Sequence, residues 1–325
     1  MSASDRKTDL KTDLRTISSE IDARDVAILR ALLEHKVLTT HQIHVLFFRS
    51  RRRCQHRLSE LKNERLLSSF EPRRDFGQGR SPEHHFLTEH GVSILARKMG
   101  VAHGDLPWVP DAGYEDNRNL RHRMGVNAFF CALAEASRAV EGHCLHRWAP
   151  ERKVRTRAGE IQPDGFGRYL HPGGACEFYL EYDRGTEGPA ALAGKLRSYL
   201  RFAAALGEGA PFPNVFVVVP NPSREGDVGE GLATVRRKPE AKADLPLFVT
   251  SEELLNGRGV LGAVWLAMDE EGERLALPDL PAVDAAPYDR GRCLGRSWTD
   301  PGARSRISAR SETPRFPIGS PRRSR

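Results

Sequence analysis

Acidic side chains gather in the stretch CEFYLEYD, residues 176–183, which alternates apolar and polar residues like a β-strand. A strand places successive side chains on opposite faces, so Glu181 and Asp183 share a face about 7 Å apart. Asp164 ends the preceding extended segment, EIQPDG, and the turn HPGGA between the two segments returns its carboxylate beside Glu181. Converging carboxylates bind a hard cation such as Mg²⁺, which lowers the pKa of a bound water and shields charge on a phosphate. The alternative is a solvated acidic strand edge.

A second chemical feature is the basic stretch SRRRCQHRLSELKNERLL, residues 50–67. Ser50 is a suitable N-cap for a helix whose core stripe is Cys54, Leu58 and Leu61. The outer face of this helix is then expected to carry six polar residues: Arg51, Arg52, Arg53, Gln55, His56 and Arg57. Clustered positive charge binds phosphate through counterion release, although an ordinary solvated basic face would also explain the arginines.

Three short helices and a hairpin are expected around this stretch. Asp22 is a plausible cap for the first helix, and Thr39 or Thr40 for a second helix that ends near Phe48. The segment 66–88 then reads as a β-hairpin around a Gly/Pro/Arg-rich loop. This order is that of a winged helix-turn-helix, in which the third helix enters the major groove of DNA and the wing contacts the backbone. The wing would carry Arg73, Arg74 and Arg80.

The rest of the chain predicts a second domain. A helix over 119–140 is followed by three extended segments, a helix over 187–206 and the buried strand NVFVVVP. A weak helix near 228–238 and two further strands follow. The predicted fold class is α+β, with an α/β second domain whose core order is αβββαβ. The predicted organisation is a disordered segment at 1–20, a winged helix-turn-helix at 21–100, a linker at 101–117, the α/β domain at 118–278 and a basic disordered tail at 279–325.

Charge is unevenly distributed along the 325 residues, although the net charge is only +7. Residues 49–80 contain ten Lys/Arg against four Asp/Glu, and residues 290–325 contain ten against two, whereas the region between them is acidic. This pattern favours nucleic acid as the partner of the two basic segments. No apolar run is long enough to cross a membrane, no secretory signal is visible at the start, and the five cysteines form no CxxC pair, so a cytoplasmic protein is expected. Walker-type and GxSxG motifs are absent, and no histidine has zinc spacing to a cysteine.

The order of several short motifs resembles a known family. RDVAILRALLEHKVLTTHQI, NLRHRMGVN, IQPDG, EYDRGTE and KLRSY occur in succession between residues 24 and 199, within a resemblance that spans about residues 22–270. In this order they resemble the replication-relaxation family of actinobacterial plasmid and integrative-element proteins, which implies a role in plasmid replication and DNA relaxation. The second domain by itself is similar to the PD-(D/E)XK nuclease fold.

The resemblance to the nuclease fold implies particular site residues. Pro163 and Asp164 match the first half of its motif, and Glu181 matches the acid of the second half. The motif lysine does not match, because Asp183 occupies its position. Lys195 on the following helix is a candidate to reach back and replace it, and the alternative is a plain surface lysine. The resemblance also implies an upstream acid as a further metal ligand, for which Glu151 is the first candidate and Glu135 the second.

Three functions follow from these features. The first is a DNA-binding protein that nicks double-stranded DNA with Mg²⁺ through Asp164, Glu181 and Lys195. The second is a non-catalytic replication initiator that keeps a degenerate nuclease-like domain and needs no cofactor. The third is a transcriptional regulator. A homodimer is compatible with each function, and none involves a membrane.

Overall fold

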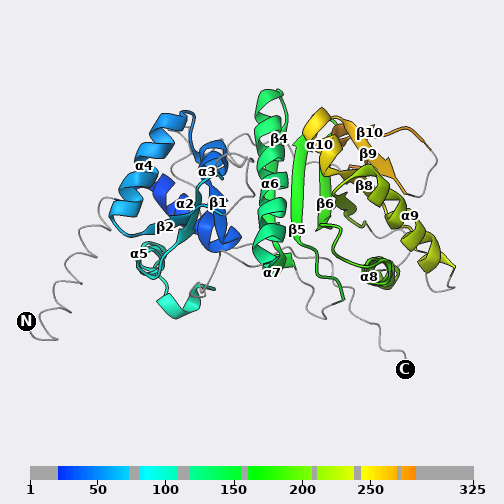
Figure 1. Cartoon of the computed structure of the whole chain (residues 1–325), viewed down its shortest axis with the longest axis horizontal. Coiled ribbons are helices and arrows are strands. Elements are labelled where there is room, and N and C mark those ends of the chain that lie inside the picture. The colour runs from blue at the N-terminus through cyan, green and yellow to red at the C-terminus, as the bar shows by residue number, and fades with distance from the viewer. Residues whose placement is uncertain are drawn as a thin grey trace, which may run out of the picture. The chain divides into compact units, whose positions relative to one another are not determined.

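The computed structural model describes residues 21–72, 81–108, 118–154, 160–206, 211–237, 243–268 and 272–282. The chain forms two compact units (Figure 1). The first unit ends at Cys131 and the second begins at Ala132, so the boundary falls inside helix α6 (Arg118–Ala139). Residues 109–117 of the expected linker lie outside the described residues.

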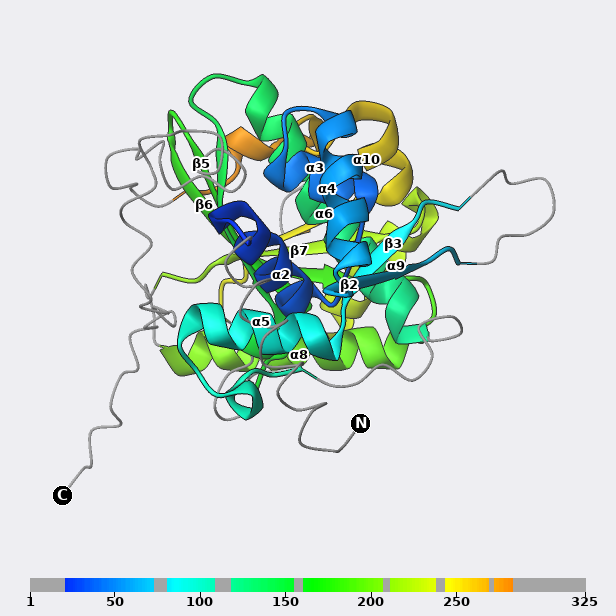
Figure 2. The ribbon, with the colours of Figure 1, turned by 90° about the vertical axis from the view of Figure 1, so that its left-hand side faces the viewer.

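The first unit contains helices and a small antiparallel sheet. Its elements are α2 (Ala23–His35), β1 (Val37–Thr39), α3 (Thr40–Phe47), α4 (Arg51–Asn63), β2 (Leu67–Phe70), β3 (His84–Leu87), α5 (Glu89–Met99) and the short helix η1 (His103–Asp105). The strand order is β1-β3-β2, and β2 and β3 form a hairpin (Figure 2). The sequence predicted this hairpin but not β1.

Side chains at the helix starts explain where the first three helices begin. Asp22, Thr39 and Ser50 are the N-caps of α2, α3 and α4, and each side chain accepts a hydrogen bond from a backbone N–H in the first turn. Asp25 and Gln42 complete capping boxes at the first two helices. The predicted caps are therefore confirmed.

The second unit is built on a seven-stranded mixed sheet. Its elements after α6 are β4 (Cys144–Pro150), α7 (Glu151–Val154), β5 (Gly165–His171), β6 (Gly174–Tyr182), α8 (Pro189–Leu206), β7 (Asn214–Val219), α9 (Pro222–Arg236), β8 (Leu247–Ser251), α10 (Glu252–Arg258), β9 (Ala263–Ala267), β10 (Leu275–Ala276) and η2 (Leu277–Asp279). The strand order is β10-β9-β8-β7-β6-β5-β4. The β6–β7 and β7–β8 pairs are parallel and the others antiparallel, which confirms the mixed α/β class.

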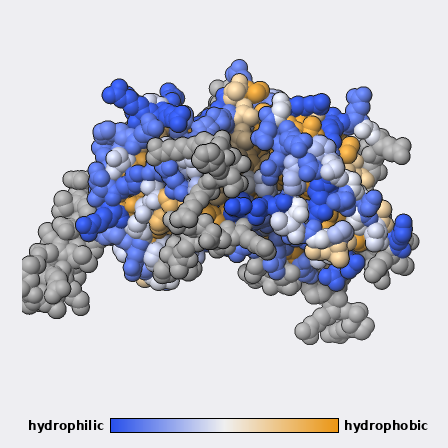
Figure 3. All heavy atoms as spheres, in the orientation of Figure 1, coloured by the Kyte–Doolittle hydropathy of each residue, from blue (hydrophilic) through white to orange (hydrophobic). Residues whose placement is uncertain are grey.

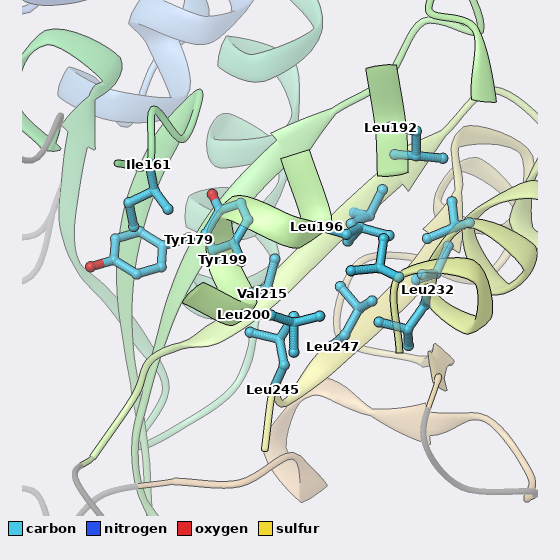
Figure 4. Close-up of a cluster of buried hydrophobic side chains, with 14 of the residues drawn as sticks. Ile161, Tyr179, Leu192, Leu196, Tyr199, Leu200, Val215, Leu232, Leu245 and Leu247 are labelled. Atoms are coloured by element: carbon cyan, nitrogen blue, oxygen red, sulfur yellow. The ribbon is translucent and has the colours of Figure 1, made fainter. Parts of the chain in front are cut away.

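Apolar side chains of α8 and α9 cover one face of this sheet. Figure 4 shows Leu196 and Tyr199 of α8 and Leu232 of α9 beside Val215 of β7, in one buried cluster. On β5 the sheet requires glycine, because a Cβ atom at Gly167 would lie 2.1 Å from the ring of Phe178. That ring is fully buried and stacks on Phe216, at 4.5 Å between centroids, so it has no room to move.

Two details of the second unit differ from the sequence-based prediction. The extended segment expected over 144–155 stops at Pro150, and Glu151–Val154 form the short helix α7. Pro150 has no N–H to continue the sheet, which accounts for the end of the strand. Asp164 precedes β5 and does not end a strand, because β5 begins at Gly165.

Candidate functional site

The start of β5 and the end of β6 bring Asp164 close to Glu181. In this antiparallel pair Gly165 lies opposite Leu180, so the residue before β5 faces the last residues of β6. The backbone N–H of Asp164 donates to the carbonyl of Leu180 at 2.9 Å, and Asp164 Oδ2 accepts from the N–H of Tyr182 at 2.8 Å. The carboxylate is thus fixed at this end of the hairpin.

Glu181 is 6% exposed and is held by two side chains of α8. The hydroxyl of Tyr199 donates to Oε1 at 2.7 Å, and Lys195 Nζ lies 3.2 Å from Oε2 in an ion pair. Burial, and next the negative charge of Asp164, raise the pKa of Glu181 to about 7, although Lys195 and Tyr199 act in the opposite direction. A carboxyl group with this pKa exchanges protons near neutral pH.

Lys195 reaches back from α8 to the acidic residues. Its Nζ also lies 2.9 Å from Glu187 Oε1, and its side chain is 36% exposed. Burial alone lowers the pKa of the ammonium, but the charges of Glu181, Glu187 and Asp164 outweigh burial and raise it. The group therefore stays protonated. The structure brings together all three residues that the sequence suggested for catalysis.

Asp183, where the resemblance places a lysine, lies beyond the end of β6 and is 5% exposed. Its Oδ2 accepts from Arg224 Nε at 2.8 Å, and its Oδ1 accepts from the N–H of Gly185 at 2.8 Å. Asp183 therefore contacts a different cation from Glu181. Sequence reasoning missed Arg224, which is 41 residues away along the chain.

Tyr199 and Glu187 were also missed as site residues. Tyr199 follows Lys195 by four residues, which places the two on one face of α8. That spacing was a usable signal. Glu187 precedes the helix in an irregular loop, and nothing in its local sequence indicates a partner.

The candidate third acids lie on α7, at the end of the strand that pairs with β5, and on the boundary helix α6. Glu151 is exposed and begins α7 directly after Pro150, whose strand partner is Gly165. Glu135 is exposed on α6. Among the described residues, no group of three or more His, Cys, Asp and Glu side chains is arranged to hold a metal ion. A cation at this site would therefore have two protein carboxylates, from Asp164 and Glu181.

On the first unit, five of the six α4 residues predicted to contact DNA are exposed: Arg51, Arg52, Arg53, Gln55 and His56. Its opposite stripe of Cys54, Leu58 and Leu61 is buried. Figure 3 shows hydrophilic residues over the α4 region of this face. The predicted wing residues Arg73, Arg74 and Arg80 lie outside the described residues.

Arg57 is placed differently from the other predicted DNA-binding residues. It lies at the flank of the buried stripe, and its Nε and Nη2 donate to the two carboxylate oxygens of Asp25 at 2.9 and 2.6 Å. Its Nη1 donates to Glu60 at 2.8 Å. Asp25 is 1% exposed, so this guanidinium neutralises a buried carboxylate and joins α2 to α4.

A family model described as Replication-relaxation matches residues 29–219. The chain belongs to the replication-relaxation family. The residues of this replication-relaxation protein that match include α4, Asp164, Glu181 and Lys195. No curated protein matches the chain, and no solved structure does. Within the described ranges, no helix combines the length and apolar character needed to cross a bilayer.

Proposed function

We propose that this replication-relaxation protein binds double-stranded DNA through α4 and nicks it with Mg²⁺ at Asp164, Glu181 and Lys195, in the replication of a plasmid or mobile element. The observation that carries the proposal is the ion pair of Lys195 with Glu181 beside Asp164. Two acids and a lysine that meet at one end of the β5–β6 hairpin are the groups that metal-dependent cleavage of a phosphodiester needs.

The first unit supports the DNA-binding part of the proposal. The order α2, α3, α4 followed by the β2–β3 hairpin agrees with a winged helix-turn-helix, with α4 as the recognition helix. Arg51, Arg52 and Arg53 stand at the start of α4, where they can contact phosphates. Gln55 and His56 follow and are suited to base edges. Arg57 contributes by holding α4 on α2 and not by contacting DNA.

The second unit supports the nuclease part. Apart from the four-residue helix α7 between β4 and β5, the succession of α6, the antiparallel strands β4, β5 and β6, α8 and the parallel strand β7 agrees with the αβββαβ order of the PD-(D/E)XK fold. Lys195 then takes the part of the motif lysine from the neighbouring helix, and Asp183 does not.

The residues present fit Mg²⁺. This ion prefers carboxylate oxygens and is commonly held by one or two carboxylates together with waters and substrate phosphate. Asp164 and Glu181 supply such a pair, and Glu181 Oε2 is a buried oxygen that lies 3.2 Å from Lys195 Nζ. When bound, Mg²⁺ would lower the pKa of a water and shield the phosphate charge.

The side chains of the site have separate tasks in this scheme. Water attacks the phosphorus, the bond to the leaving sugar oxygen breaks, and a phosphate monoester and a hydroxyl result. Glu181 would hold the ion together with Asp164 in its ionised form, while the proton of the attacking water would pass to solvent and a solvent proton would complete the leaving hydroxyl. Lys195 remains a cation and stabilises the negative charge on the phosphate oxygens. Asp164 is held rigidly by the N–H of Tyr182.

A second candidate function is a non-catalytic DNA-binding initiator or transcriptional regulator. Two observations favour this function. Asp183 occupies the position of the motif lysine and forms an ion pair with Arg224. Lys195 is held in ion pairs by two carboxylates. In that case the acids and the lysine would stabilise the second unit only.

Cleavage of supercoiled plasmid in Mg²⁺ or Mn²⁺ distinguishes the two functions. We expect the wild type to produce nicked circles, and Asp164→Asn, Glu181→Gln and Lys195→Met to abolish them. The matched control is Glu177→Gln. Glu177 is a half-buried acid on the same strand as Glu181, and it forms an ion pair with Arg168 at 3.0 Å. EDTA should stop the reaction. Intact plasmid with the wild type, or equal cleavage by Glu181→Gln, would refute the nuclease proposal.

A further inference from the structure

Arg224 connects two points of the loop that leaves β6. It is the third residue of α9 and is 13% exposed at its side chain. Its Nε donates to Asp183 Oδ2 at 2.8 Å, and its Nη2 donates to the carbonyl of Glu187 at 2.5 Å. Its Nη1 donates to Asp227 at 2.8 Å. One guanidinium therefore binds the start of this loop, the end of the loop and its own helix.

The same loop leads to the candidate catalytic lysine. Glu187 uses its carbonyl for Arg224 and its carboxylate for Lys195, whose Nζ lies 2.9 Å from Oε1. The loop is anchored at its start as well, because the N–H of Asp183 donates to the carbonyl of Val218 at 2.9 Å. Displacement of the loop would therefore move one of the two acids that hold the ammonium.

We infer that Asp183 and Arg224 form a clasp that positions Lys195, by holding Glu187 where its carboxylate fixes the ammonium next to Glu181. Arg224 is a positioning residue and does not touch DNA. The clasp also gives Asp183 a task at the place where the resemblance expects a lysine: it anchors the loop, and the lysine comes from α8. The catalytic meaning of the clasp rests on the proposed nuclease function, whereas its effect on Lys195 does not.

The position of Lys195 can be measured without activity, by acetylation with acetic anhydride at pH 9 followed by peptide mass spectrometry. An ammonium held in two ion pairs reacts slowly, and Lys195 Nζ is held by Glu181 at 3.2 Å and by Glu187 at 2.9 Å. We expect Lys195 to react much more slowly than the exposed Lys153 in the wild type. Arg224→Ala and Glu187→Gln should both increase its rate, because the first displaces and the second neutralises the carboxylate that holds Nζ at 2.9 Å. Arg237 is an exposed arginine at the other end of α9, and the control Arg237→Ala should leave the acetylation rate of Lys195 unchanged.

Plasmid nicking supplies the second readout. Arg224→Ala should lower kcat by on the order of 10- to 100-fold while KM and DNA affinity stay the same, because only the lysine is misplaced. Arg224→Lys should recover part of the loss, since an ammonium keeps the charge but cannot form the three-way contact.

Unchanged labelling of Lys195 in a folded Arg224→Ala protein would overturn the clasp. If that variant does not fold, unchanged labelling in Glu187→Gln would overturn it equally. Faster labelling in both variants, together with a wild type that does not nick DNA, would support the clasp and refute the nuclease proposal alone.

Discussion

Glu181 combines a carboxylate, almost complete burial and a second acid nearby. Burial and Asp164 raise its pKa from the ordinary 4.5 to about 7, so the folded chain binds this proton more tightly than the unfolded chain. Stability from this group therefore increases as the pH falls from 7 toward 4.5, and it is absent above pH 7. The ionised form that would serve catalysis is the form that costs stability.

The replacement Glu181→Gln tests this linkage. Glutamine has the same shape without the charge, so we expect it to stabilise the protein at pH 8 by on the order of 1–3 kcal/mol. The difference from the wild type should shrink toward zero at pH 5, where Glu181 is protonated. Thermal melting of both proteins in EDTA across this pH range measures this difference in stability. A variant less stable than the wild type at pH 8 would contradict the assigned direction of the pKa.

The sequence predicted single residues only where the local pattern was sufficient. Strand alternation identified Glu181, and the hairpin turn brought Asp164 toward it even though Asp164 starts a strand and does not end one. Arg224 could not be predicted, because its partners Asp183 and Glu187 are about 40 residues distant and meet it only after the parallel strands β6 and β7 have paired. Such contacts are products of tertiary structure.

At the scale of helices, the orientation of α4 depends on a buried ion pair. Arg57 of α4 binds both carboxylate oxygens of Asp25, which also belongs to the capping box of α2. Removing one partner of a buried pair leaves the other charge unpaired in a low dielectric. The exposed face of α4, which we propose to contact DNA, is therefore held in its orientation by Arg57 on the opposite side of the same helix.

We expect Arg57→Ala to destabilise the first unit by about 3 kcal/mol, since Asp25 would stay buried without its cation. Hydrogen exchange of peptides from α2 and α4 measures the loss within this unit. Arg52→Ala is the matched control, because Arg52 is exposed on the same helix, and its effect should be within about 0.5 kcal/mol. Equal exchange rates in the two variants would show that the Asp25 pair is not what secures α4.

Elements were predicted best where caps and periodicity agreed. The N-caps Asp22, Thr39 and Ser50 and the buried stripe of α4 follow from the sequence. The three-residue strand β1 and the four-residue helix α7 are too short to show a period. β1 forms because it pairs with β3, and α7 forms where β4 ends at Pro150.

At the scale of the whole molecule, basic and acidic residues are concentrated in different parts of the chain. Residues 49–80 have an excess of six positive charges, and the region from 81 to 289 is acidic. The chain belongs to the replication-relaxation family, and the basic segment is the part of the chain that we propose to bind DNA. DNA binding through α4 is common to the nuclease and to the non-catalytic function, so it is the central claim.

The most direct test is the affinity for a DNA duplex, measured by fluorescence anisotropy between about 50 and 200 mM salt. We predict that replacing Arg51, Arg52 and Arg53 with alanine weakens binding and reduces the slope of log K against log salt by about 0.9 for each phosphate that the variant no longer neutralises. The control is the single replacement Arg237→Ala, of an exposed arginine on the second unit, which should change neither quantity. An unchanged affinity and slope in the triple variant would mean that the arginines of α4 are only a solvated face, and would contradict the account.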